Sequence, residues 1–412
     1  MTTLTAAAPL AANQPAPSQS FFKRLAAHPQ AAYYLIIAAG GALTACGVIM
    51  VASAASVVSQ VQTDDPYYFG KRQILFAVVG LAFAWLLSRL PPRHLRRLAW
   101  PALLLAVIFV TLTYTRFGVE VNGNRNWLRL GPSWTQFQPS EFAKLALIVW
   151  GARHLADKGR RLGDLREWLS YVAVSLVLIA GVGVHDFGSA CVIAAMFIAT
   201  LFLAGAPLRL IGALGLAGAV GGVGLVLAVR GSQLSRIVAW LHPSQYALTY
   251  NFQANHGLYA LASGGWWGEG LGASRQKWGG LMVTGHTDYI LAIIGEELGL
   301  AGSLTVIGLF ILLCGAGLLA ARRSDDVFKR LVVAGVACWF ALQAIVNIAV
   351  VVRWLPGLGV TLPLVSYGGS SLLATLMALG IMAGCARADG PPRKTAAPAV
   401  ARITSVFARR RP

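Results

Sequence analysis

Apolar residues occur in this chain as long runs, without the alternation that is typical of soluble helices and strands. The ten runs lie at residues 31–58, 72–90, 98–115, 139–156, 168–184, 189–205, 208–229, 289–321, 331–352 and 367–386. An α-helix needs about 20 such residues to cross the hydrocarbon core of a bilayer. Hydrophobic residues make up 57% of the chain and charged residues 12%, which excludes an ordinary soluble domain. The pattern predicts an all-α polytopic integral membrane protein with about ten transmembrane helices.

Lysine and arginine are divided unevenly between the predicted connections. Of the 34 such residues, about 23 fall in alternate connections and at the two chain ends, and the positive-inside rule places that side in the cytoplasm. Both termini are therefore predicted to be cytoplasmic, with a disordered tail at 1–30, a membrane domain at 31–387 and a basic tail at 388–412. The net charge of +19 then faces anionic membrane lipid, so nucleic-acid binding is not needed to explain it.

The longest predicted connection, residues 230–288, lies on the opposite, extracellular side between the seventh and eighth spans. Four tryptophans occur in it, at Trp240, Trp266, Trp267 and Trp278. This aromatic content argues against disorder and favours a position on the membrane interface. Long loops in compact proteins usually have a function, so we expect the chemistry of the protein on its external face.

Four segments carry sequence motifs in a fixed order along the chain. They are residues 138–144 (QPSEFAK), 262–272 (ASGGWWGEGLG), 286–299 (HTDYILAIIGEELG) and 362–371 (LPLVSYGGSS). These segments resemble motifs of the SEDS family (shape, elongation, division and sporulation), and the similarity covers about residues 31–387. The two polar tails are more similar to those of the family's division members than to those of its elongation members.

The resemblance implies a peptidoglycan glycosyltransferase that polymerises lipid II at the outer face of the bacterial cytoplasmic (inner) membrane, at the division septum. It also implies a class B penicillin-binding transpeptidase and other divisome membrane proteins as partners. The reaction would join the 4-hydroxyl of one lipid-linked disaccharide to C1 of another and release undecaprenyl diphosphate. Such chemistry needs a base near the hydroxyl and cationic or hydrogen-bonding support for the leaving diphosphate.

Asp288 matches the position of the family's catalytic aspartate, at the point where the long loop enters the eighth span. A carboxylate at the mouth of a membrane helix is costly unless it is solvated, paired or functional. As a general base it would profit from partial desolvation, which raises the pKa of a carboxyl. The alternative is a helix N-cap, because aspartate favours that position. The two roles are compatible.

Three further charged residues are candidates for contact with the diphosphate. Glu141 and Lys144 are three residues apart at the start of the fourth span, so they share one helical face. They form either an ion pair that lets both charges enter the membrane edge or a phosphate-binding cation held by Glu141. Arg125 is a second phosphate candidate because a guanidinium suits such oxygens. It stands one position earlier than the family's arginine, which leaves its role open.

The remaining candidates are His286, Ser366, Ser370 and Arg353. His286 is a candidate for substrate contact, but a lone His-x-Asp is weak evidence for a metal site. No protein-held metal is predicted, whereas Mg²⁺ held mainly by the substrate diphosphate would leave almost no sequence trace. Ser366 and Ser370 either donate to phosphate or pack a broken helix start. Arg353 stands where the family often has glycine, and we expect it to snorkel rather than to touch diphosphate.

Two other functions remain open, a lipid II flippase or other transporter and a non-catalytic scaffold that activates a partner synthase. A transporter is typically built from internal repeats with charged residues at mid-membrane, and the sequence shows no convincing repeat.

Asp186 is interpreted as a turn former and N-cap of a short outer hairpin. The eighth and ninth spans carry apolar and small residues around their circumference, so we expect both to leave surface for a partner helix.

Overall fold

The computed structural model describes residues 30–387, except 122–123, 130, 132–135, 160–164 and 230–231. Within them, residues 32–387 form one unit by their contacts. The predicted tails, residues 1–30 and 388–412, fall almost entirely outside the described residues.

Ten long helices in the described part of the chain coincide with the ten apolar runs. They are α2 (Ala31–Ala54), α4 (Tyr68–Arg89), α5 (Pro92–Leu112), α6 (Pro139–Lys158), α7 (Arg166–Gly183), α8 (Phe187–Leu203), α9 (Leu208–Val229), α12 (Ile290–Arg323), α13 (Val327–Val351) and α14 (Gly369–Ala386). Eight of these described helices are long and apolar enough to cross a membrane. Of the other two, α8 has 17 residues and α6 carries charges near both ends. The predicted all-α membrane fold is confirmed.

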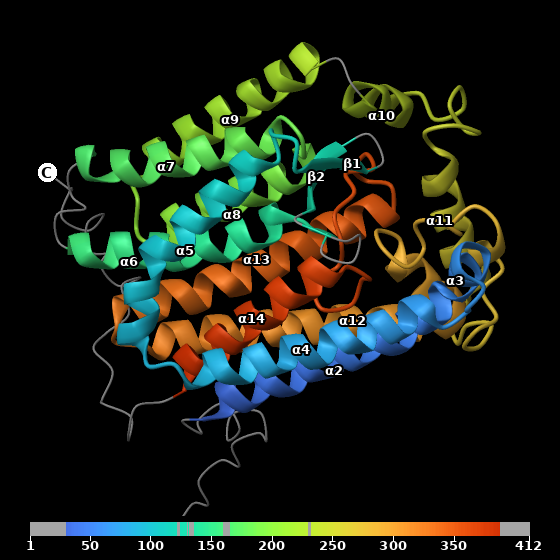
Figure 1. Cartoon of the computed structure of the whole chain (residues 1–412), viewed down its shortest axis with the longest axis horizontal. Coiled ribbons are helices and arrows are strands. Elements are labelled where there is room, and N and C mark those ends of the chain that lie inside the picture. Colours follow the sequence, from blue (N-terminus) through green and yellow to red (C-terminus); the bar gives the residue numbers. More distant parts are fainter. Residues whose placement is uncertain are drawn as a thin grey trace, which may run out of the picture. The chain divides into compact units, whose positions relative to one another are not determined.

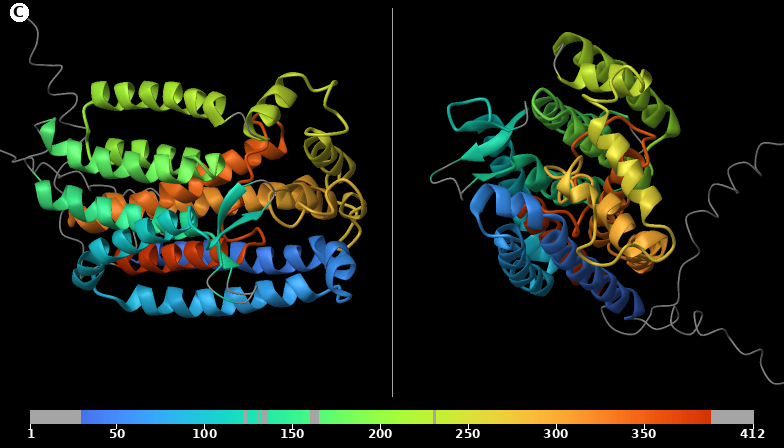
Figure 2. Two further views of the ribbon diagram at one scale, coloured as in Figure 1. Left: turned by 45° about the horizontal axis from the view of Figure 1, so that its top comes forward. Right: turned by 90° about the vertical axis from the view of Figure 1, so that its right-hand side faces the viewer.

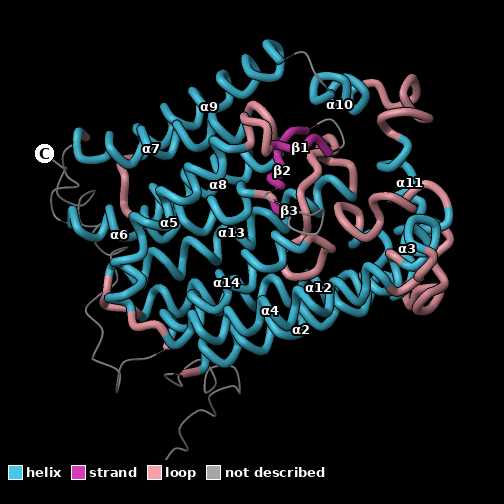
Figure 3. The backbone as a smooth tube through the Cα atoms, in the orientation of Figure 1, coloured by secondary structure: helices cyan, strands magenta, loops and turns pink. Residues whose placement is uncertain are grey.

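The two ends of the helix bundle differ in their connections (Figures 1 and 3). At one end, short turns join α4 to α5, α8 to α9 and α12 to α13. The other end carries α3 (Ser56–Thr63), α10 (Ser232–Leu241), α11 (Phe252–Ser263), the short 3₁₀ helix η3 (Gln276–Trp278) and a three-stranded sheet. The right-hand view of Figure 2 looks onto this end. The polar-aromatic segments are therefore gathered at one end of the bundle, on the side predicted to be external.

The small sheet lies between α5 and α6 in the chain. Its strands β1 (Gly118–Val121), β2 (Asn124–Arg129) and β3 (Gln136–Phe137) pair antiparallel in the order β1-β2-β3. Leu128 pairs with both Gly118 and Phe137 and is fully buried. The sheet thus anchors the connection to the bundle just before α6 begins.

Helix α13 lies at the centre of the bundle, where it packs against α12, α14, α6 and α8. Ala344, near its middle, is 2% exposed. Most of this ninth span therefore packs against neighbouring helices of the same chain, and the surface expected for a partner helix is limited to a strip around Ile345, which is 60% exposed. On α12, by contrast, Leu304, Ile311 and Leu312 are exposed.

The long external loop folds back onto the start of α12 and explains two of the four motifs. The amides of Glu269 and Gly270 donate to the carbonyls of Glu296 and Glu297, at 2.9 and 3.0 Å. These acceptors lie where α12 is interrupted at Gly299, whose φ of +71° is readily adopted by glycine. The two motifs, far apart in sequence, thus form one interlocked backbone structure.

Candidate functional site

Asp288 lies two residues before α12 and is half-buried. The N-cap of α12 is Tyr289, and no side chain caps this helix. The structure therefore does not support the N-cap alternative for Asp288. No described residue donates a hydrogen bond to its carboxylate. A Cβ built on Gly359 would lie 3.7 Å from Asp288 Oδ2, so the segment after α13 passes close to this group.

The environment of Asp288 raises the pKa of its carboxyl above that of an ordinary aspartate. Burial raises the pKa of its carboxyl to about 6, and the negative charge of Asp186 acts in the same direction. The positive charge of Arg236, on α10, opposes this change. A pKa of about 6 is much better suited to accepting a proton near neutral pH than that of an ordinary aspartate.

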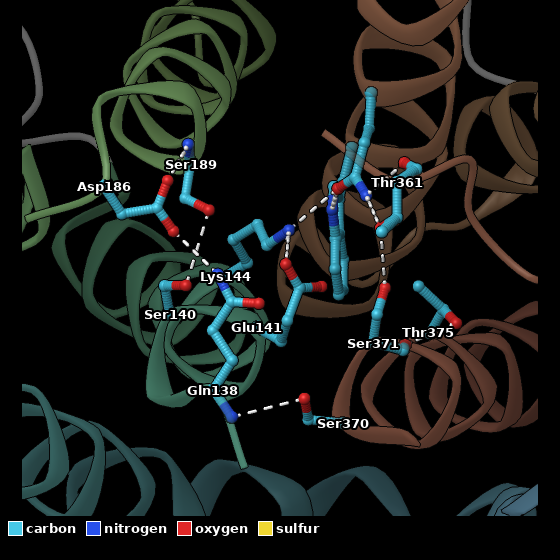
Figure 4. Close-up of polar contacts among 12 residues, drawn as sticks. Gln138, Ser140, Glu141, Lys144, Asp186, Ser189, Thr361, Ser370, Ser371 and Thr375 are labelled. Atoms are coloured by element: carbon cyan, nitrogen blue, oxygen red, sulfur yellow. Dashed lines mark hydrogen bonds and ion pairs between the residues drawn. The ribbon is translucent and has the colours of Figure 1, made fainter. Parts of the chain in front are cut away.

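Glu141 and Lys144 form a buried ion pair on the first turns of α6 (Figure 4). Their side chains are 5% and 1% exposed, and Lys144 Nζ lies 2.7 Å from Glu141 Oε1. Lys144 also donates to Gln343 Oε1 at 2.8 Å and lies over the ring of Trp339. The second oxygen, Glu141 Oε2, is buried and has no hydrogen-bond partner among the described residues. The predicted pair is present, and it retains one open acceptor.

Asp186 occupies the N-cap of α8, as predicted, where Oδ1 accepts from the amide of Ser189 at 2.9 Å. Its other oxygen, Oδ2, accepts from Asn126 Nδ2 at 2.9 Å and from Gln138 Nε2 at 2.7 Å. Figure 4 shows Asp186 and Ser189 on one side of Lys144, with Thr361 on the other. Asp186 therefore joins β2 and the start of α6 to α8, beside the candidate site.

Ser366 and Ser370 use their hydroxyls within the protein. Ser366 Oγ donates to the carbonyl of Thr287 at 2.6 Å and accepts from the amide of Leu362 at 2.8 Å. Ser370 Oγ accepts from the amide of Gln138 at 3.2 Å. Both serines are buried. These contacts favour the packing interpretation over the one that makes the hydroxyls phosphate donors.

His286 is 6% exposed and packs against the rings of Phe69 and Tyr367, which also contact each other. Burial lowers the pKa of its imidazole to about 4, so the ring is neutral at physiological pH. Nδ1 has no partner in the part of the chain that the structure describes. Histidine, cysteine and acidic side chains form no group of three or more with metal-binding geometry among the described residues. His286 therefore packs beside Asp288 as a neutral, aromatic group.

Two predicted arginines make contacts with the chain itself. Arg125 is exposed, and its Nη2 donates to the carbonyl of Thr115 at 2.6 Å. This bond ties β2 to the end of α5, and the structure places Arg125 in no contact with the other candidate residues. Arg353 donates from Nη1 to Asn255 Oδ1 at 2.9 Å, while its Nη2 is buried without a partner among the described residues. The bond to Asn255 holds the guanidinium against α11, and snorkelling of Arg353 stays a prediction.

Three residues that the sequence analysis missed connect these groups. Arg236 donates to the carbonyl of Gly357 at 3.2 Å and is the cation whose charge acts on Asp288. Gln343 and Asn347 are buried amides on α13. Polar side chains four residues apart within an apolar span are themselves a signal of a functional or packing role. The aromatic loop around Arg236 offered no comparable pattern.

Comparison with known proteins gives a consistent result. The model of the family described as "Cell cycle protein", named for FtsW, RodA and SpoVE, matches residues 33–389. A probable peptidoglycan glycosyltransferase FtsW of Trichlorobacter lovleyi is 40% identical over 83% of this chain and 89% of its own length. The stage V sporulation protein E of Bacillus subtilis is 36% identical over 84% of this chain and 94% of its own length.

Two solved structures share the fold. One is a chain from a peptidoglycan synthase complex that coordinates polymerization and crosslinking, with a TM-score of 0.69 and 28% identity over 86% of this chain and 97% of that one. The other is the rod shape determining protein RodA of Thermus thermophilus, with a TM-score of 0.62 and 28% identity over 85% of this chain and 95% of that one. Both likenesses extend over nearly the whole described bundle.

Proposed function

Because the chain belongs to the cell cycle protein family of FtsW, RodA and SpoVE, we propose that it is a peptidoglycan glycosyltransferase that polymerises lipid II during cell division. The FtsW relatives, which are probable peptidoglycan glycosyltransferases, support the enzyme class, and the description of the family as cell cycle proteins supports the division role. The observation that carries the proposal is Asp288, a half-buried carboxylate with a raised pKa and with no hydrogen-bond donor among the described residues.

The proposed roles follow from the contacts of each group. Asp288 accepts the proton of the 4-hydroxyl of one lipid-linked disaccharide as that oxygen bonds to C1 of another. The bond from C1 to the diphosphate breaks with its electron pair on the diphosphate, which leaves as undecaprenyl diphosphate. Lys144 supplies positive charge for the leaving group, and Glu141 and Gln343 hold its ammonium in place. Proton transfer is thus assigned to Asp288, and stabilisation of the leaving diphosphate is assigned to Lys144.

A divalent cation is compatible with these residues but is not part of the steps above. Glu141 Oε2 has no protein partner among the described residues, and the carboxylate of Asp288 receives no hydrogen bond from them. Oxygen ligands of this kind are those that Mg²⁺ prefers, together with substrate phosphates and water. When bound, the ion would neutralise charge on the diphosphate.

A class B penicillin-binding transpeptidase with a single membrane span is the proposed partner. The similar chain from a synthase complex that couples polymerization and crosslinking supports this. The exposed face of α12 that carries Leu304, Ile311 and Leu312 offers an apolar contact surface for its helix. Other divisome membrane proteins are further expected partners at the septum.

Replacement of the proposed base tests the function directly. The variant Asp288→Asn keeps the shape of the side chain but cannot accept the proton, so polymer formation from lipid II should fall by at least about 10²-fold. The assay uses the purified full chain with its transpeptidase partner in lipid nanodiscs. A matched control is Glu269→Gln, which neutralises an exposed carboxylate of the same loop and should leave the rate unchanged.

Near-normal polymer formation by Asp288→Asn would exclude Asp288 as the base. If the unaltered chain with its partner forms no polymer but moves lipid II across a membrane, the flippase alternative replaces the enzyme. If polymer forms only when a separate glycan synthase is added, and at the same rate with Asp288→Asn, the chain is a scaffold.

A further inference from the structure

Two amide side chains stand one turn apart on α13 and link the proposed base to the proposed cation. Gln343 and Asn347 are 0% and 1% exposed. A buried amide in an apolar span lowers stability unless its polar atoms are hydrogen-bonded. Their positions, four residues apart, put both on one face of the helix, and each reaches a different member of the candidate site.

Gln343 contacts the cation. Its Oε1 accepts from Lys144 Nζ at 2.8 Å and from Trp339 Nε1 at 2.7 Å. Its Nε2 donates to the carbonyl of Thr361 at 2.9 Å, the residue that Figure 4 shows beside Lys144. The amide thereby fixes the ammonium group against the segment that follows α13.

Asn347 contacts the backbone of the base. Its Nδ2 donates both to the carbonyl of Asp288 and to the carbonyl of Val360, each at 2.8 Å. Val360 directly precedes Thr361, so the two amides of α13 bind adjacent carbonyls of one segment. Through that segment and through α13 itself, the position of Asp288 is tied to the position of Lys144.

The backbone at Asp288 is held at three successive carbonyls. Besides the bond from Asn347, the amide of Tyr367 donates to His286 at 2.8 Å and Ser366 Oγ donates to Thr287 at 2.6 Å. The side chain of Asp288 remains free while its backbone is fixed. A general base needs this combination, because a shift of about 1 Å in a reacting group can lower a rate by about 10²-fold.

One unsatisfied atom argues against a purely stabilising role for Asn347. Its Oδ1 is buried and has no hydrogen-bond partner among the described residues. Leaving a buried acceptor unpaired lowers stability, so a residue selected for stability alone would not retain it. Such atoms in native structures call for a functional explanation.

We propose that Gln343 and Asn347 are positioning residues, which hold Asp288 and Lys144 at a fixed separation for glycan transfer. The proposal rests on the proposed function of Asp288. It predicts that loss of the Asn347 amide lowers the rate of the chemical step without weakening the binding of lipid II.

The test uses Asn347→Leu, which keeps the branching and the number of heavy atoms of the side chain but removes both N–H donors. With the full chain and its partner, kcat per folded molecule should fall about 10²-fold, while KM for lipid II stays within about twofold. The matched control is Thr375→Val, which removes a buried hydroxyl bonded within α14 and should lower only thermal stability. Unchanged kcat in folded Asn347→Leu would overturn the proposal.

A double-variant cycle separates this inference from the function on which it rests. If Asn347 acts through Asp288, then Asn347→Leu should lower the residual rate of Asp288→Asn by less than about twofold, because the two effects are not additive. A full additional loss in the double variant would show that Asn347 acts elsewhere. If Asp288→Asn alone is fully active, the proposed function fails first. If only Asn347→Leu is active, the positioning role fails alone.

Discussion

Two buried glutamate–lysine pairs in this molecule differ in how completely their polar atoms are bonded. In the loop pair, Lys277 Nζ lies 3.1 Å from Glu297 Oε1. Both oxygens of Glu297 also accept from Ser53 Oγ at 2.7 Å, and Lys277 donates to the carbonyl of Gly272 at 2.7 Å. Every charged atom of this pair has a partner, and the bonds fasten α2 and the external loop to α12.

The pair on α6 is equally buried but incompletely bonded. Lys144 has Glu141 and Gln343 as acceptors, whereas Glu141 Oε2 has no described partner. Burial therefore does not distinguish the two pairs, since all four side chains are at most 5% exposed. The two pairs differ in the completeness of their hydrogen bonding. We call the Lys277–Glu297 pair the saturated pair, because every charged atom in it is bonded, and it stabilises the structure. We call the Glu141–Lys144 pair the open pair, because Glu141 Oε2 remains available for a ligand.

Removal of one partner from the saturated pair should have the largest effect on stability. Glu297→Leu leaves the ammonium of Lys277 buried without its counter-charge, which should lower the free energy of unfolding by about 3–5 kcal/mol. The measurement is thermal or denaturant unfolding in nanodiscs. The double variant Glu297→Leu with Lys277→Met should recover most of the loss. A single variant as stable as the parent would remove the structural role assigned to this pair.

Replacement of both charges in each pair separates stability from activity. An apolar replacement of a whole buried pair is often neutral for stability, so both double variants should fold. Glu141→Leu with Lys144→Met should lower polymerisation by about 10²-fold, because positive charge at the leaving group is lost. Glu297→Leu with Lys277→Met should retain most of the activity per folded molecule. Equal losses of activity in the two double variants would contradict the distinction.

The two ion pairs also differ in whether their contacts could be predicted from the sequence. Glu141 and Lys144 share a helical face at a spacing of three residues, so helix geometry alone predicted their contact. Lys277 and Glu297 meet through an irregular loop, and no periodic pattern connects them. The ten spans were predictable because the bilayer dictates long apolar runs. The contacts of Arg125 could not be predicted, because they depend on strand pairing and on the path of the loop.

The site itself was predictable only in part, for a related reason. Asp288 was found because a charge at the mouth of an apolar run is conspicuous. Its supporting contacts are mostly to backbone carbonyls, at Thr287 and Asp288 among others. Any residue has a carbonyl, so such bonds leave no trace in residue type at the acceptor. For Ser366 the sequence therefore left two alternatives open, a phosphate donor or a packing residue at a broken helix start, and its bonds to the backbone favour the second.

The rate of polymerisation should also depend on pH, through the carboxyl of Asp288. The pKa of Asp288 is about 6, and the base must be deprotonated. Polymerisation should therefore fall as the pH decreases through about 6. Arg236 lowers this pKa, while burial and Asp186 raise it. Arg236→Gln should thus move the acidic limb of the kcat/KM profile, which reports the pKa of the free enzyme, to higher pH. Neighbouring Tyr289 and His286 remain neutral in this range.

The control for this shift is Glu269→Gln, which removes an exposed charge of the same loop. Its pH profile should coincide with that of the parent. A profile that moves to lower pH in Arg236→Gln would mean that a different group limits the rate, since loss of a positive charge cannot lower the pKa of a nearby carboxyl.

Arg353 has one bonded nitrogen, as in the saturated pair, and one buried nitrogen without a described partner, as in the open pair. Its replacement should have the smallest effect on stability. One nitrogen is bonded to Asn255, another is buried without a described partner, and its φ is +65°. This left-handed conformation costs a non-glycine residue about 1–2 kcal/mol, which explains why glycine suits the position. Arg353→Gly and Arg353→Ala both lose the bond to Asn255, but only glycine relieves the backbone. The glycine variant should therefore be more stable than the alanine variant by about 1 kcal/mol, measured by unfolding of the two side by side. Equal stabilities would mean that the surrounding contacts, rather than φ, determine the cost at this position.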